Sequence, residues 1–261
     1  MNNYKKLESG RSMIEMLGVL AIIGVLSVGG IAGYSKAMTK FKTNKVADNV
    51  SMIVTNIRTL YAQQKTYTGL DNKSAVEMGV VPDELVGTLT GTTQSLTNAF
   101  LGSVYIGAGK VANMDGETGA SAGTARGFYV IMNGLPKEAC VTLATNDWGS
   151  GYSSGLVGIV VNGAEQTGDS SSVQDIKCTG GSGSAGAAGS QQGASNNIGG
   201  NGTALASANM GLTDGGGAAT STTWAACVNG TGDGKTPMNV AKAAAACSST
   251  SNANSILWKF Y

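Results

Sequence analysis

The chain has 261 residues, a net charge of +1 at pH 7, four cysteines and no histidine. Without histidine, neither a Ser-His-Asp triad nor a Cys-His pair can form, and no paired carboxylates single out an acid and a base. A charge this close to zero gives no indication of nucleic-acid binding. The composition therefore predicts that the protein is not an enzyme, and no residue pattern indicates a cofactor or a metal.

The first predicted element is a membrane-spanning segment behind a short basic leader. Residues 1–10 read MNNYKKLESG, and residues 16–35 carry no charge. At about 1.5 Å per residue, this uncharged run is long enough to cross a hydrocarbon core of roughly 30 Å as a helix. In an ordinary secretory signal, cleavage removes the apolar part. Here the best small residue for cleavage, Gly10, precedes the apolar run, so a cut there would keep the run on the mature protein.

Glu15 lies at the edge of the apolar run. After a cut behind Gly10, Arg11 would be the first residue and Glu15 the fifth. A carboxylate at the edge of a bilayer is costly, so it usually serves a function or pairs with a cation. Two interpretations stay open at this point: Glu15 acts in assembly, or it is an interfacial charge that marks the start of the membrane helix.

The order of Gly10, Arg11, Glu15 and the apolar run resembles the class III signal of type IV pilins and pseudopilins. One departure is Arg11, because the first mature residue in that family is more often Phe or Met. The resemblance implies that a prepilin peptidase removes the leader and that the new N-terminus is methylated. It further implies that inner-membrane assembly machinery moves the subunit from the membrane into a helical homopolymer. Glu15 would then pair with the α-ammonium of Arg11 on a neighbouring subunit.

Residues 36–64 continue the membrane segment without proline or glycine. Their apolar residues recur three or four apart, which draws one stripe along a helix. The stripe consists of Val46, Val50, Ile53, Val54, Ile57, Leu60 and Tyr61. The sequence thus predicts one helix from near residue 12 to near residue 64. Its membrane half (residues 11–35) is apolar on all sides, and its amphipathic half (residues 36–65) has one face to cover.

Residues 66–261 are expected to form one globular head. Short helices are predicted at residues 74–78, 82–89 and 135–145, and strands at residues 127–132, 156–161 and 255–260. This mixture indicates an α+β head with a mostly antiparallel sheet. The resemblance to type IV pilins implies that this sheet packs on the long N-terminal helix. The segment GLPKEACVTLAT, a following strand, and a late cysteine before a closing strand resemble a type IVb pilin head.

The cysteines are Cys140, Cys178, Cys227 and Cys247, and they would reach an oxidising periplasm once the membrane is crossed. Four cysteines allow three pairings, which the sequence alone leaves open. The resemblance to type IVb heads implies a disulfide between Cys140 and Cys247. Cys178 and Cys227 are then left to close a second loop.

Residues 179–223 form a glycine-rich insertion with 13 glycines and a single charge, Asp214. Such a segment buries little apolar surface, so it is either flexible on the filament surface or ordered by its neighbours and the disulfide. Gly181, Gly183 and Gly186 have the spacing of a dinucleotide-binding fingerprint. No clear strand feeds a helix there, so nucleotide binding is not predicted.

Three functions are compatible with these features. The first is the structural subunit of a type IVb-like pilus, held in the inner membrane with its head in the periplasm and later displayed on the cell surface. The second is a pseudopilin of a type II secretion system, whose head usually lacks a disulfide-bounded loop; the cysteines therefore favour the pilus. The third is a minor pilin or adhesin, against which stands the absence of aromatic residues in the insertion.

Overall fold

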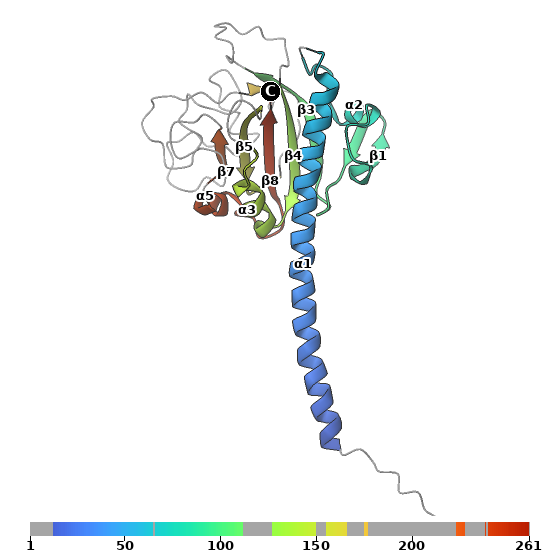
Figure 1. The fold of residues 1–261 in the computed structure, drawn as a ribbon, viewed down its shortest axis with the longest axis vertical. Helices are drawn as coiled ribbons and strands as arrows, with labels where there is room; N and C mark the ends of the chain where they lie inside the picture. Colours follow the sequence, from blue (N-terminus) through green and yellow to red (C-terminus); the bar gives the residue numbers. More distant parts are fainter. Residues whose placement is uncertain are drawn as a thin grey trace, which may run out of the picture. The chain divides into compact units, whose positions relative to one another are not determined.

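The structure is a computed structural model that describes residues 13–64, 66–111, 127–149, 155–165, 175–176, 223–227, 238 and 240–260 (Figure 1). The chain divides into two compact units, Met1–Phe41 and Lys42–Tyr261. Helix α1 (Met13–Tyr61) contributes its first part to one unit and its last part to the other. The predicted long helix is confirmed, and it ends at Tyr61.

In the first unit, α1 exposes apolar side chains on all sides. Every residue from 13 to 37 is exposed. Among the described residues, α1 is the single helix that is long and apolar enough to cross a membrane, by length and composition. A helix with no polar face in this part has no surface suited to water, as expected for a membrane segment or for a helix buried among others.

The second unit is built on a six-stranded sheet with the order β6-β3-β4-β8-β5-β7. The strands are β3 (Val104–Val111), β4 (Gly127–Leu135), β5 (Leu156–Asn162), β6 (Asp175–Ile176), β7 (Thr223–Cys227) and β8 (Asn254–Phe260). All neighbours are antiparallel except β3 and β6. The last strand, β8, therefore lies in the middle of the sheet between β4 and β5 (Figure 1). The predicted antiparallel α+β head is confirmed.

Smaller elements complete the head. They are α2 (Asn72–Glu77), the 3-10 turn η1 (Asp83–Leu85), the hairpin strands β1 (Val86–Thr90) and β2 (Thr93–Leu96), α3 (Lys137–Thr145) and α5 (Val240–Ala246). The helix predicted at residues 82–89 is wrong, because only η1 is helical there and β1 follows at once. Threonine and valine favour extended backbone, and Gly91, at φ 62°, forms the turn to β2. Apart from Thr223, the glycine-rich insertion lies outside the described residues.

The core forms where the last part of α1 meets one face of the sheet. Val46, Val50, Ile53 and Ile57 are fully buried on α1, which confirms most of the predicted stripe. Because side chains alternate along a strand, β8 presents every second residue to this cluster. These residues are Ile256, Trp258 and Phe260. Leu60 is an exception to the stripe, with 45% of its surface exposed, whereas Tyr61, the last predicted residue of the stripe, is buried.

A row of aromatic rings joins the end of α1 to the sheet. Ring centroids lie 5.1 Å apart between Tyr61 and Tyr67, 4.9 Å between Tyr67 and Phe128, and 5.3 Å between Phe128 and Phe260. The Arg58 guanidinium carbon lies 5.1 Å from the Phe260 ring centroid. Burial raises the pKa of Tyr67, and the nearby Arg58 charge opposes that rise. These aromatic residues therefore serve core packing.

Candidate functional site

The residues predicted for processing and assembly lie at the start of the chain. Gly10 and Arg11 are outside the described residues, so their role stays a prediction. Glu15 lies in the first turn of α1 and is exposed. A carboxylate is favourable there because the helix N-terminus carries partial positive charge. In the predicted role, Glu15 is thus available to a second subunit, and that role also remains a prediction.

The first part of α1 offers a contact surface that its own chain leaves open. Large side chains such as Leu17, Val25 and Ile31 are exposed. A Cβ atom added at Gly18, Gly24, Gly29, Gly30 or Gly33 would meet nothing within 4 Å. The fold of the single chain therefore does not need these glycines. Small residues on an apolar helix allow a neighbouring helix to approach closely.

Within the head, three contacts fasten α1 to the segment between α2 and β3. Lys45 Nζ forms an ion pair with Glu84 Oε2. Asn56 Nδ2 donates to the Val80 carbonyl over 3.1 Å. The hydrogen bond from Lys45, helped by one from Asn49, lowers the pKa of Glu84 even though partial burial opposes the shift. These polar links depend on distant residues, and no local pattern of the sequence indicates them.

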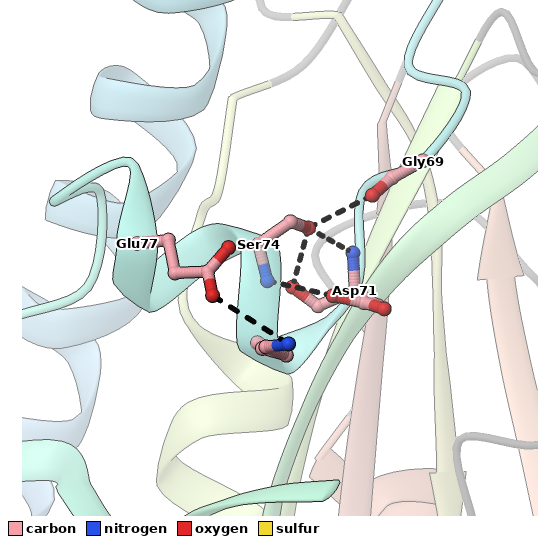
Figure 2. A network of polar contacts seen from close by, with 5 residues as sticks. Gly69, Asp71, Ser74 and Glu77 are labelled. Carbon is pink, nitrogen blue, oxygen red and sulfur yellow. Dashed lines mark hydrogen bonds and ion pairs between the residues drawn. The ribbon is translucent and has the colours of Figure 1, made fainter. Parts of the chain in front are cut away.

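A capping box starts α2 (Figure 2). The Ser74 backbone N–H donates to Asp71 Oδ1 over 2.7 Å, and the Asp71 N–H donates to Ser74 Oγ over 2.8 Å. The Ser74 hydroxyl also lies 2.8 Å from the Gly69 carbonyl oxygen, to which it donates. This arrangement satisfies backbone donors that a helix start leaves open. An aspartate three residues before a serine is a capping signal that is visible in the sequence and that could have located this helix start.

Asn72 then ties α2 to two strands. Its side-chain nitrogen donates to the Gln94 carbonyl on β2 over 3.2 Å and to the Val104 carbonyl on β3 over 3.0 Å. Its side-chain oxygen accepts from the Ile106 N–H over 2.7 Å. One amide therefore joins the hairpin, α2 and the main sheet into one body.

The disulfide expected from the resemblance is present between Cys140 and Cys247. Their Cα atoms lie 5.9 Å apart, and both residues are fully buried. Cys140 lies on α3 and Cys247 directly follows α5, so the bond joins these two helices. Both helices precede β8 in the chain. Cys178 and the side chain of Cys227 lie outside the described residues, and their pairing stays a prediction.

The turn between Cys247 and β8 is held by Asn254, which is fully buried. Asn254 Nδ2 donates to the Leu135 carbonyl over 2.9 Å and to the Ser249 carbonyl over 3.1 Å. Its Oδ1 accepts from the Ser249 N–H over 2.9 Å. Together with the disulfide, this side chain positions the start of the central strand.

Comparison with known proteins decides the family. The model "PilS N terminal" matches residues 40–198, which is more than half of the chain. The chain belongs to the type IVb pilin family. The pilin is also 32% identical over 146 residues to the "Major structural subunit of bundle-forming pilus" of Escherichia coli O127:H6 (strain E2348/69 / EPEC), covering 56% of the pilin and 68% of that relative. The same values hold for the subunit from Escherichia coli O111:H-.

Two solved pilin structures are similar to the pilin at 13% sequence identity. The first is the type IV b pilin from Salmonella typhi, with a TM-score of 0.41. The match covers 81% of this pilin and 94% of the Salmonella pilin. The second is TcpA, a type IV pilin from the Vibrio cholerae El Tor biotype, with a TM-score of 0.44. The match covers 84% of this pilin and 99% of TcpA.

Family membership makes the protein a structural pilin and not an enzyme. Within the part of the chain that the structure describes, no three histidine, cysteine, aspartate or glutamate side chains gather to hold a metal ion. A structural subunit acts through its surfaces, and here these are the apolar part of α1 and the exposed faces of the head.

Proposed function

We propose that the pilin is the major subunit of a bundle-forming type IV pilus, assembled as a helical homopolymer through α1. The observation that carries the proposal is the apolar part of α1, exposed on all sides and joined to a disulfide-bonded head. An apolar surface of this extent is stable only when lipid or other protein covers it. In a filament of identical copies, the α1 helices would cover one another.

The proposed maturation starts with a cut after Gly10 by a prepilin peptidase. The chain would then consist of a removed leader (residues 1–10), a membrane and filament-core half of the helix (11–35), an amphipathic half (36–65) and a head (66–261). Before assembly, the helix would hold the subunit in the inner membrane with its head in the periplasm. Assembly machinery of the inner membrane would transfer it to a surface pilus.

Glu15 would set the register of each added subunit. In an apolar filament core, an unpaired carboxylate is costly, and a pair with the α-ammonium of Arg11 on a neighbour reduces that cost. Only one axial offset brings the two charges together. A subunit at the wrong offset would bury both charges unpaired, so the pair would favour one arrangement over the others.

The experiment that tests this proposal is identification of the dominant protein in sheared surface filaments. The proposal predicts that this pilin is the dominant protein and that deletion of its gene removes the filaments. Trace amounts, or a location at the tip only, would instead indicate a minor pilin or adhesin. A pilin that is processed yet missing from surface filaments would indicate a pseudopilin of a type II secretion system.

A further inference from the structure

Leu101 combines an unusual backbone with an unusual exposure. Its φ of 67° lies in the left-handed region, which a side chain with a Cβ atom adopts only at an energetic cost. The residue is also 85% exposed, more than any other large apolar residue described in the head. Glycine or asparagine would suit this backbone better, and a polar residue would suit the exposure better.

Hydrogen bonds of Asn98 and of the backbone hold the loop that carries Leu101. Asn98 is buried, and its Oδ1 accepts from the N–H groups of Phe100 over 2.8 Å and Gly102 over 3.2 Å. Its Nδ2 donates to the Asn133 carbonyl on β4 over 2.7 Å. The backbone closes the loop as well, since the Leu101 N–H donates to the Asn98 carbonyl over 2.9 Å. Leu101 therefore cannot relax its backbone without breaking this network.

Two further contacts fix the position of the loop. A Cβ atom on Gly102 would lie 1.9 Å from the Asn133 carbonyl oxygen, so the loop backbone sits directly against β4. On the other side, Phe100 is partly buried against the core, and Lys42 Nζ of α1 lies 5.8 Å from its ring centroid. Leu101 thus projects into solvent from a rigid base between β4 and the part of α1 at Lys42.

Strained residues of this kind persist where the surroundings enforce them, and they gather at functional positions. Among the described residues, a leucine at this tip gains little contact, because most of its surface faces solvent. The benefit of the leucine must then come from outside the single chain. A preorganised apolar side chain loses little entropy when a partner covers it.

The exposed face of α1 in the head has a surface on which the Leu101 side chain could pack. Between Asp48 and Arg58 the helix contains no charged residue, and Ser51, Met52 and Thr55 are exposed there. The Thr55 hydroxyl donates to the Ser51 carbonyl over 2.8 Å, so its donor is already used inside the helix. The exposed face of a surface helix normally carries charged residues. A face without charges can be covered by an apolar side chain without the cost of burying a charged group.

We propose that Leu101 is an intersubunit contact that packs on the Ser51–Met52–Thr55 face of α1 in a second copy of the chain. A helical polymer needs such pairs of different surfaces, because a head-to-tail contact that does not close a ring extends into a filament. The α1 face also continues, along the same helix, the apolar part through which we propose that the copies assemble. This inference rests on the proposed pilus function and names one contact within it.

The test compares filaments of full-length variants, each expressed as the sole copy of the subunit. Leu101→Gly and Leu101→Asn fit the left-handed backbone at least as well as leucine, so the head should fold and form the Cys140–Cys247 disulfide normally. Met52→Gln probes the opposite surface. Leu89→Asn is the matched control, because Leu89 is an exposed leucine (56%) on the hairpin strand β1.

Purified filaments are incubated in mild detergent, and the ratio of released to filamentous subunit is measured. Loss of one buried leucine contact should raise this ratio about tenfold for the Leu101 variants, with a rise for Met52→Gln and none for Leu89→Asn. The inference is overturned if the Leu101 variants match wild type, or if Leu89→Asn weakens the filament equally. Normal filaments from these variants would leave the pilus function standing, whereas wild-type cells without filaments of this subunit would overturn both proposals.

Discussion

Cys140 and Cys247 lie 107 residues apart in the chain, yet their Cα atoms are 5.9 Å apart in the head. The bond joins α3, which follows β4, to the end of α5, which precedes β8. The loop that the disulfide closes contains β5, β6 and β7, and the neighbouring strands β4 and β8 lie just outside its two ends. In the chain-entropy description, closing a loop of about 100 residues stabilises the folded state by about 4.7 kcal/mol.

Replacing Cys140 should therefore weaken the head strongly. We expect Cys140→Ser to lower the free energy of unfolding by about 2–5 kcal/mol and to leave Cys247 as a free thiol. Thiol labelling of the denatured protein, followed by peptide mapping, identifies the released cysteine. Labelling of Cys178 or Cys227 in place of Cys247 would contradict the pairing.

Glu84 predicts a pH dependence of head stability. Its pKa in the folded chain is lowered from 4.5, chiefly by the hydrogen bond from Lys45, so the folded state binds its proton less readily than the unfolded state does. The contribution is fully present above the unfolded pKa and is lost as pH falls through the lowered folded pKa. Because both side chains are about 40% exposed, the effect is small and salt-sensitive.

Glu84→Gln should therefore flatten the loss of stability below about pH 4.5 without changing the fold. Denaturant unfolding of the detergent-solubilised chain at several pH values measures this difference. Glu77→Gln, which removes the exposed partner of Lys73, corrects for the loss of one negative charge. Identical pH profiles for Glu84→Gln and Glu77→Gln would refute the assigned role of the Lys45–Glu84 pair.

The elements that could be predicted from the sequence depend on local patterns. Val46, Val50 and Ile53 recur with the helical period, so the stripe on α1 is visible without knowledge of its partner. The closing strand is likewise visible as an apolar run, but its place between β4 and β5 depends on pairing with distant strands. The hairpin β1–β2 is not predictable in the same way, because short threonine-rich strands carry a weak periodic signal.

The polar links of the head could not be predicted from the sequence, because they too join residues that are distant in the chain. Asn72 bonds to Val104 and Ile106, which lie over thirty residues away, and no local pattern distinguishes it from a surface asparagine. Leu101 resembles an ordinary loop leucine in the sequence, and only its backbone angle and exposure set it apart. Gly10 and Glu15 are the opposite case, because their fixed spacing carries the prediction and no fold is needed to find them.

Gly102 predicts a sharp steric effect. A Cβ atom there would lie 1.9 Å from a backbone carbonyl oxygen of β4, which cannot move without disturbing the sheet. We expect Gly102→Ala to destabilise the head by about 1–3 kcal/mol or more. Leu101→Gly, at the adjacent position, should be neutral or stabilising because it relieves the left-handed strain. Denaturant unfolding of the two variants compares them, and an unchanged midpoint for Gly102→Ala would disprove the close contact.

Variants of Gly10 and Glu15 test two separate steps, the processing of the subunit and its assembly. Glu15→Ala should still be processed but should enter filaments poorly when it competes with wild-type subunits. Gly10→Ala should instead remain at its unprocessed length on a gel. Tagged variants, co-expressed with wild type, report both processing and the share of each variant in sheared filaments. Wild-type incorporation of Glu15→Ala would argue against the register role.

The central claim is that the pilin is cut behind Gly10 and enters a filament with its apolar helix intact. The most direct measurement is the intact mass of the subunit from sheared, purified filaments. We predict a chain that begins at Arg11, carries one N-terminal methyl group and retains residues 16–35. A filament subunit that begins at Met1, or at any residue after 35, would contradict the account.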